Sequence, residues 1–181
     1  LHNDKETAGI GLSMSCASAY LEALPQARIG LVPAAVGGTP LSRWMPGEDL
    51  YERALGIGRK ALGGGALKAI LWHQGETDAQ HLERAQSYGQ RLAEMVGTLR
   101  EALDTTDVPF VVGGLGDFLA VHPTCIHYGL VNDALQNLNV DRCGFASAEG
   151  LGEFDGIHFN SAALRILGQR YATELLRLVG A

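Results

Sequence analysis

Apolar residues recur along this chain at two different spacings, and the two spacings separate expected helices from expected strands. Residues that repeat every three or four positions predict helices over 12–24, 50–62, 79–103, 126–138 and 162–178. Short continuous apolar runs predict buried strands over 28–32, 67–72, 109–112 and 144–146, with a glycine-rich loop over 113–123. Strands that alternate with helices indicate a parallel sheet covered on both faces, whose functional residues gather at the carboxyl ends of the strands.

Length and composition narrow the class of protein. With 181 residues, 46% of them hydrophobic, the chain can bury the core of one domain. A net charge of -6 with scattered Lys and Arg gives no basic stripe, so nucleic acid is not an expected partner. No apolar run approaches the roughly 20 residues that span a bilayer, so we expect no membrane association. The compartment stays open, because the chain starts at Leu1 without Met.

Three short polar blocks follow the ends of expected strands. The first is the Gly37–Gly38 turn, the second is Trp72-His73-Gln74-Gly75-Glu76, and the third is Asp155-Gly156-Ile157-His158 at the entry to the last helix. An Asp three residues before a His can present a general base beside the carboxylate that orients it. Alone, this spacing is also typical of a loop that caps a helix, so its meaning depends on the other two blocks.

Together, in this order, the blocks resemble the SGNH hydrolase superfamily, in the branch of sialate O-acetylesterases and family 6 carbohydrate esterases. The likeness runs from His2-Asn3-Asp4-Lys5 to the last helix. It implies a three-layer α/β/α sandwich with a parallel flavodoxin-like sheet, formed by residues 1–181 as a single domain. It also implies a carbohydrate O-acetylesterase that needs no cofactor and attacks an acetylated sugar through an acetyl-serine intermediate.

The resemblance assigns the catalytic roles. His158 would be the general base, and both Asp155 and Glu76 are candidates for the acid that orients it. We favour Asp155, because the three-residue spacing brings its carboxylate back beside the imidazole. The backbone N–H of Gly38 and the side-chain amide of Gln74 would stabilise the oxyanion.

Two further side chains could face the sugar. Trp44 and His73 are candidates for a sugar-facing surface.

One alternative chemistry remains. The branch needs no metal, but four side chains could together bind one, and metal-assisted hydrolysis is kept as a minor alternative. These side chains are His73, Glu76, Asp155 and His158.

The serine nucleophile is the missing part of the pattern. The resemblance implies a Gly-Asp-Ser or Gly-Gln-Ser-Asn block after a first strand, and this sequence contains neither. Ser13 and Ser15 lie within an expected helix, which makes either a poor candidate. We therefore expect an N-terminally truncated chain. The missing first strand, which would lie in the sheet between the strands over 28–32 and 67–72, would come from a segment that precedes Leu1, from a cleaved N-terminal segment that stays bound, or from another chain. The alternative is a catalytically dead remnant that acts as a glycan-binding or structural module.

Overall fold

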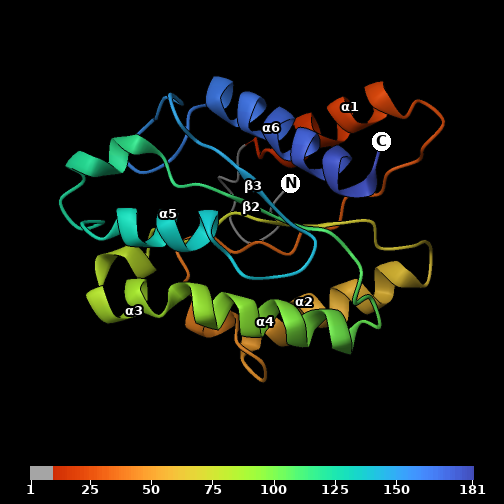
Figure 1. Cartoon of the computed structure of the whole chain (residues 1–181), viewed down its shortest axis with the longest axis horizontal. Coiled ribbons are helices and arrows are strands. Elements are labelled where there is room, and N and C mark those ends of the chain that lie inside the picture. Colours follow the sequence, from red (N-terminus) through yellow and green to blue (C-terminus); the bar gives the residue numbers. More distant parts are fainter. Residues whose placement is uncertain (1–9) are drawn as a thin grey trace.

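The computed structural model describes residues 10–181, and its centre is a small parallel sheet (Figure 1). The strand order is β1 (Ile70–Trp72), β2 (Phe110–Gly113), β3 (Cys143–Ala146). Val111 of β2 lies opposite Leu71 on one side and Gly144 on the other. The three strands confirm the predicted runs near 67–72, 109–112 and 144–146.

Helices cover both faces of this sheet (Figure 1). One layer holds α1 (Ser13–Ala23) and α6 (Ser161–Val179), which pack together along their lengths. The opposite layer holds α2 (Asp49–Leu62), α3 (Leu82–Gln86), α4 (Tyr88–Ala102) and α5 (Tyr128–Gln136). Short 3₁₀ helices complete the described chain over Leu41–Trp44, Asp78–Gln80 and Asp117–Val121.

Each face of the sheet has its own hydrophobic core. Side chains alternate along a strand, so Phe110 and Val112 of β2 enter the core under α2 and α4. Val111 enters the other core, where it meets Leu167 and Tyr171 of α6. All three β2 residues are 0% exposed. This arrangement confirms the predicted α/β/α sandwich with a parallel sheet.

The expected strand over 28–32 is wrong. This segment has no regular secondary structure, and Ile29, Leu31 and Val32 are 38%, 42% and 46% exposed. A strand needs a neighbour that accepts and donates its backbone hydrogen bonds, and none of residues 10–181 provides one here. The expected likeness over His2-Asn3-Asp4-Lys5 lies outside the described residues.

The single helix expected over 79–103 is two helices, α3 and α4, with Ser87 between them. The Ser87 hydroxyl donates to the carbonyl of Glu83 at 2.8 Å, and the Ser87 backbone has φ -91° and ψ 0°. Such side-chain bonds compete with the regular helical pattern. Tyr88 and Arg91, which take part in the polar network described below, follow this break in the first turn of α4.

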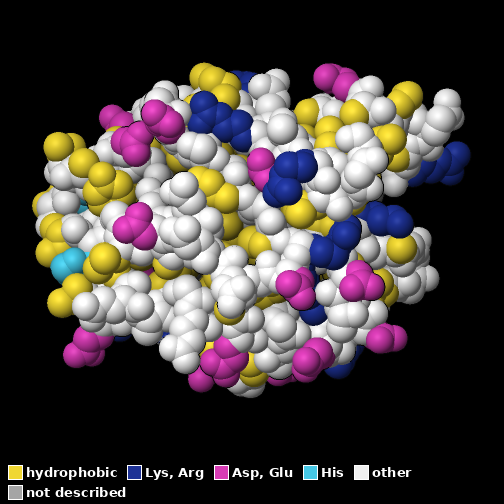
Figure 2. Space-filling view, in the orientation of Figure 1, with side chains coloured by type: hydrophobic (Ala, Val, Ile, Leu, Met, Phe, Trp, Pro, Cys, Tyr) yellow, Lys and Arg dark blue, Asp and Glu magenta, His cyan; other side chains and the backbone are white. Residues whose placement is uncertain are grey.

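One end of the molecule carries exposed apolar side chains. Figure 2 shows hydrophobic side chains gathered at the end where α3 and α5 lie. Val121 and Ile126, in the segment that leads into α5, are 89% and 65% exposed. The loop that leads into α6 lies at this same end (Figure 1). Within the described residues, no helix has both the length and the hydropathy needed to span a bilayer.

Candidate active site

The loop before α6 holds an acid and a base in direct contact. Asp155 Oδ2 lies 2.8 Å from His158 Nδ1. The other carboxylate oxygen of Asp155 accepts the backbone N–H groups of Ile157 at 3.2 Å and His158 at 2.9 Å. These bonds orient the carboxylate toward the imidazole, so the short sequence spacing produces the predicted pair.

The pair is anchored at both ends of its loop. Glu153 and Phe159 form an antiparallel bridge across the base of the loop. Asn160 then caps α6, because its side-chain oxygen accepts the N–H of Ala163 at 2.9 Å. The imidazole is therefore presented from a closed loop directly before a capped helix.

Electrostatics keep Asp155 ionised. Its hydrogen bond to the His158 ring, helped by the backbone N–H of His158, lowers the pKa of Asp155 to about 2. A charged carboxylate accepts the Nδ1–H of His158 and leaves the unprotonated Nε2 as the basic atom. The His158 side chain is 71% exposed, so a substrate can reach it.

Glu76, the rival orienting acid, makes no bond to His158 in this structure. Its carbonyl accepts a weak bond from Cys125 Sγ at 3.5 Å. The contact to His158 is made by Asp155 instead. The four side chains considered for a metal do not form a site, since residues 10–181 contain no group of three His, Cys, Asp or Glu suited to an ion.

The Gly37–Gly38 turn is held by Thr39 and Trp44. The Thr39 hydroxyl donates to the carbonyl of Val36 at 2.9 Å and accepts the indole N–H of Trp44 at 3.0 Å. Gly38 has φ +71°, a conformation that favours glycine, and a Cβ there would meet no atom within 4 Å. A methyl side chain at this position would therefore meet no described atom, and the backbone conformation is what favours glycine.

The amide of Gln74 is fully engaged within the protein. Its nitrogen donates to the Thr39 carbonyl at 3.0 Å and to Asp78 Oδ2 at 2.8 Å. Its oxygen accepts the Tyr88 hydroxyl at 3.0 Å. A primary amide has two N–H donors, so an oxyanion would have to replace one of these acceptors.

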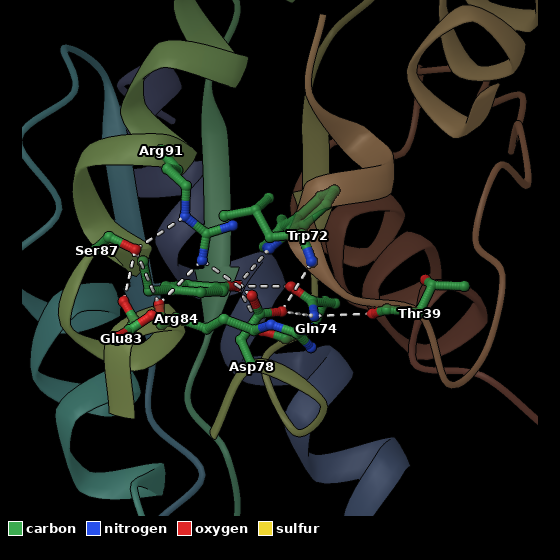
Figure 3. A network of polar contacts seen from close by, with 10 residues as sticks. Thr39, Trp72, Gln74, Asp78, Glu83, Arg84, Ser87 and Arg91 are labelled. Carbon is green, nitrogen blue, oxygen red and sulfur yellow. Dashed lines mark hydrogen bonds and ion pairs between the residues drawn. The ribbon is translucent and has the colours of Figure 1, made fainter. Parts of the chain in front are cut away.

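Asp78 is the functional candidate that the sequence motifs did not reveal. Its side chain is fully buried and belongs to a polar network that joins the turn, the end of β1 and α4 (Figure 3). Three donors reach it: the Leu41 N–H at 2.8 Å, the Gln74 amide at 2.8 Å and Arg91 Nη2 at 3.0 Å. The sequence does show an acidic residue two positions after Glu76. An acid at that position is also common at the start of a helix, so it did not indicate a buried network.

The two side chains expected to face a sugar point into the protein. Trp44 is 7% exposed and packs edge-on against Trp72, with ring centroids 5.3 Å apart. His73 Nδ1 lies 3.2 Å from the hydroxyl of Tyr171, and its Nε2 is buried without a partner among the described residues. Burial lowers the pKa of His73, while the nearby charge of Glu76 opposes this shift. Both rings are therefore largely enclosed by protein in this structure.

No described serine bonds to His158. Ser15 of α1 packs against Gly168 in the middle of α6, so it belongs to a helix interface rather than the site. Among residues 10–181, the side-chain partner of the His158 ring is Asp155 alone.

Similarity to known proteins agrees with this geometry. A family model described as carbohydrate esterase, sialic acid-specific acetylesterase matches residues 1–177. "Probable carbohydrate esterase At4g34215" of Arabidopsis thaliana is 32% identical and covers 97% of this chain and 68% of its own length. A solved structure titled as the X-ray structure of protein AT4G34215 from Arabidopsis thaliana superposes with a TM-score of 0.89 and 29% identity. That superposition covers 97% of this chain and 72% of the other.

The layered fold is consistent with that of the SGNH hydrolases, and an Asp–His pair lies at the entry to its last helix. The chain belongs to the carbohydrate esterase family of sialic acid-specific acetylesterases.

Proposed function

We propose that this protein is a carbohydrate O-acetylesterase that hydrolyses acetyl esters on sugar hydroxyl groups. The observation that carries the proposal is the 2.8 Å contact between Asp155 Oδ2 and His158 Nδ1 on an exposed loop. This contact sets the tautomer in which Nε2 can take a proton from a hydroxyl nucleophile and return it to the leaving alcohol.

The nucleophile in this proposal is a serine outside the 181 residues. Support comes from the free approach to His158 and from the absence of a described hydroxyl beside it. The serine oxygen would attack the acetyl carbon and pass its proton to His158. The alcohol would leave with that proton, and water would then release acetate from the acetyl-serine.

The Gly38 backbone N–H is the proposed oxyanion donor. It belongs to a turn with open space beside it, and a backbone donor needs no side-chain rearrangement during the reaction. Gln74 supports this donor by bonding the carbonyl of Thr39, the next residue. Glu76 has no proposed contact with the reacting atoms.

An aromatic side chain on the catalytic loop can contact the sugar. Phe154 is 79% exposed and directly precedes Asp155, and its N–H donates to the carbonyl of His158 at 2.8 Å. An exposed, well-anchored ring is an apolar platform on which one face of a sugar can rest. This role replaces the one expected for Trp44 and His73.

The test uses the complete gene product and two substrates, an aryl acetate and an acetylated sugar. His158→Ala should abolish hydrolysis of both, and Asp155→Asn should lower kcat by about 10⁴-fold if the wrong tautomer results, as in serine proteases. Phe154→Ala should raise KM for the acetylated sugar while leaving the aryl acetate little changed. Undiminished hydrolysis by the His158→Ala variant would rule out the proposed mechanism.

The nucleophile is located in the same preparation. A fluorophosphonate probe should label a serine, and peptide mass spectrometry should place it outside residues 1–181. Failure to label a protein that shows no hydrolysis would favour the second candidate, a non-catalytic module of the same fold.

A further inference from the structure

We propose that Asp78 is a positioning residue, whose buried carboxylate clamps the Gly38 turn against the end of β1 in the geometry that catalysis needs. This inference rests on the proposed function, since the turn is the proposed oxyanion donor. It begins from an unusual observation: the Asp78 side chain is fully buried although an ionised carboxylate is costly to remove from water.

The contacts of Asp78 show where its charge acts. Oδ2 accepts two donors, the backbone N–H of Leu41 and the amide of Gln74, both at 2.8 Å. Leu41 lies three residues beyond Gly38, and Gln74 lies two residues beyond the end of β1. One oxygen atom therefore connects the segment of Leu41, 37 positions before Asp78, with that of Gln74, 4 positions before it.

A second bond closes the clamp. The same Gln74 nitrogen donates to the carbonyl of Thr39, the residue that follows Gly38. The turn is thus held at Thr39 through its carbonyl and at Leu41 through its N–H. On the other side of Gly38, the Thr39 hydroxyl donates to the Val36 carbonyl at 2.9 Å. The Gly38 N–H therefore lies between the held Val36 carbonyl and the held groups of Thr39 and Leu41, which limits rotation of its peptide.

Arg91 neutralises the clamp without touching the turn. Its Nη2 donates to the other carboxylate oxygen, Oδ1 of Asp78, at 3.0 Å, and its remaining bonds go to Arg84 and Ser87 (Figure 3). The Arg91 side chain is 22% exposed, so it connects the buried charge to the surface. Asp78 bonds to the turn and Arg91 does not, so comparing variants of the two residues separates a positioning role from a purely structural one.

The experiment compares Asp78→Asn with Arg91→Met in the complete gene product. Asp78→Asn leaves one acceptor oxygen for three donors. Because the bond from the charged Arg91 is the stronger one, we expect the oxygen to turn to Arg91 and the N–H₂ group to face the Leu41 N–H and the Gln74 amide, so the turn should shift. We expect kcat for the aryl acetate to fall about 10- to 100-fold with KM little changed, since small misplacements of reacting groups cost this much. Arg91→Met removes the counter-charge but leaves the bonds to Leu41 and Gln74, so Tm should fall while kcat stays close to that of the unmodified enzyme.

Glu174→Gln is the matched control, because Glu174 forms an ion pair with Arg177 on α6, in the layer opposite the helices that surround the clamp. It should change neither kcat nor Tm appreciably. If Asp78→Asn lowers only Tm, or if kcat falls equally in Arg91→Met, the positioning role is wrong.

Amide hydrogen exchange separates the clamp from the proposed function. The Leu41 N–H should exchange slowly in the unmodified protein and much faster in Asp78→Asn. Unchanged Leu41 exchange would overturn the clamp whatever the activity shows. If the unmodified protein shows the protected Leu41 N–H but no ester hydrolysis, the proposed function fails, and the catalytic role of Asp78 fails with it.

Discussion

Stability at mildly acidic pH should be limited by His73. Its Nδ1 lies beside the hydroxyl of Tyr171, which itself donates to the Trp72 carbonyl at 2.6 Å. The Tyr171 oxygen can therefore accept the Nδ1–H of a neutral imidazole. A second proton would have to enter at Nε2, which is buried without an acceptor among the described residues.

The direction in which pH changes the folding stability follows from the direction of the His73 pKa shift. Burial lowers the pKa of His73 below its ordinary 6.5 in the folded state, so the unfolded chain binds more protons below that pH. Folding stability therefore falls as the pH falls. If folded His73 stays neutral, the loss between pH 7.5 and pH 5.5 is about 1.4 kcal/mol, and it grows by about 1.4 kcal/mol for each further pH unit.

The assay is urea unfolding of the protein at several pH values between these limits. His73→Asn is the informative variant, because its amide can still donate to Tyr171 but cannot titrate. The difference in unfolding free energy between the unmodified protein and His73→Asn should shrink as the pH falls. His81→Asn, at an exposed position, should leave the slope unchanged. Parallel pH profiles for the unmodified protein and His73→Asn would refute the reasoning.

Three other outcomes are expected. Tyr88→Phe should lower the free energy of unfolding by about 1–3 kcal/mol in a urea titration, because it leaves the buried indole N–H of Trp72 without its acceptor at 3.1 Å. Gly168→Ala should lower it by about 1–3 kcal/mol, since the added methyl group would collide with the carbonyl of Leu12 and push α1 from α6. Pre-incubation with EDTA should leave ester hydrolysis unchanged, because the proposed chemistry uses a serine, the Asp155–His158 pair and a backbone N–H donor rather than a metal ion; loss of activity that zinc restores would contradict it.

Local patterns in the sequence were enough for the Asp155–His158 pair. The two residues are three positions apart, so a single turn decides their contact, and the tight loop before α6 delivers it at 2.8 Å. Helical periodicity likewise placed α2, α5 and α6 close to their observed bounds. The break at Ser87 escaped the same reasoning, because the apolar spacing continues through it and the backbone bonds from Ser87 to Glu83 and from Arg91 to Ser87 keep their helical pattern.

Contacts between distant segments were decided by tertiary structure. Hydropathy could not show that Asp78 is buried, because its donors Leu41 and Arg91 lie 37 and 13 positions away. The sequence left the amide of Gln74 available as a donor. In the structure it donates a hydrogen bond to the carbonyl of Thr39, 35 positions earlier. The run over 28–32 has the composition of a strand, yet backbone groups pair only where a neighbour lies alongside. Residue types thus determined which chemistry is possible, and packing determined which donors remain available for it.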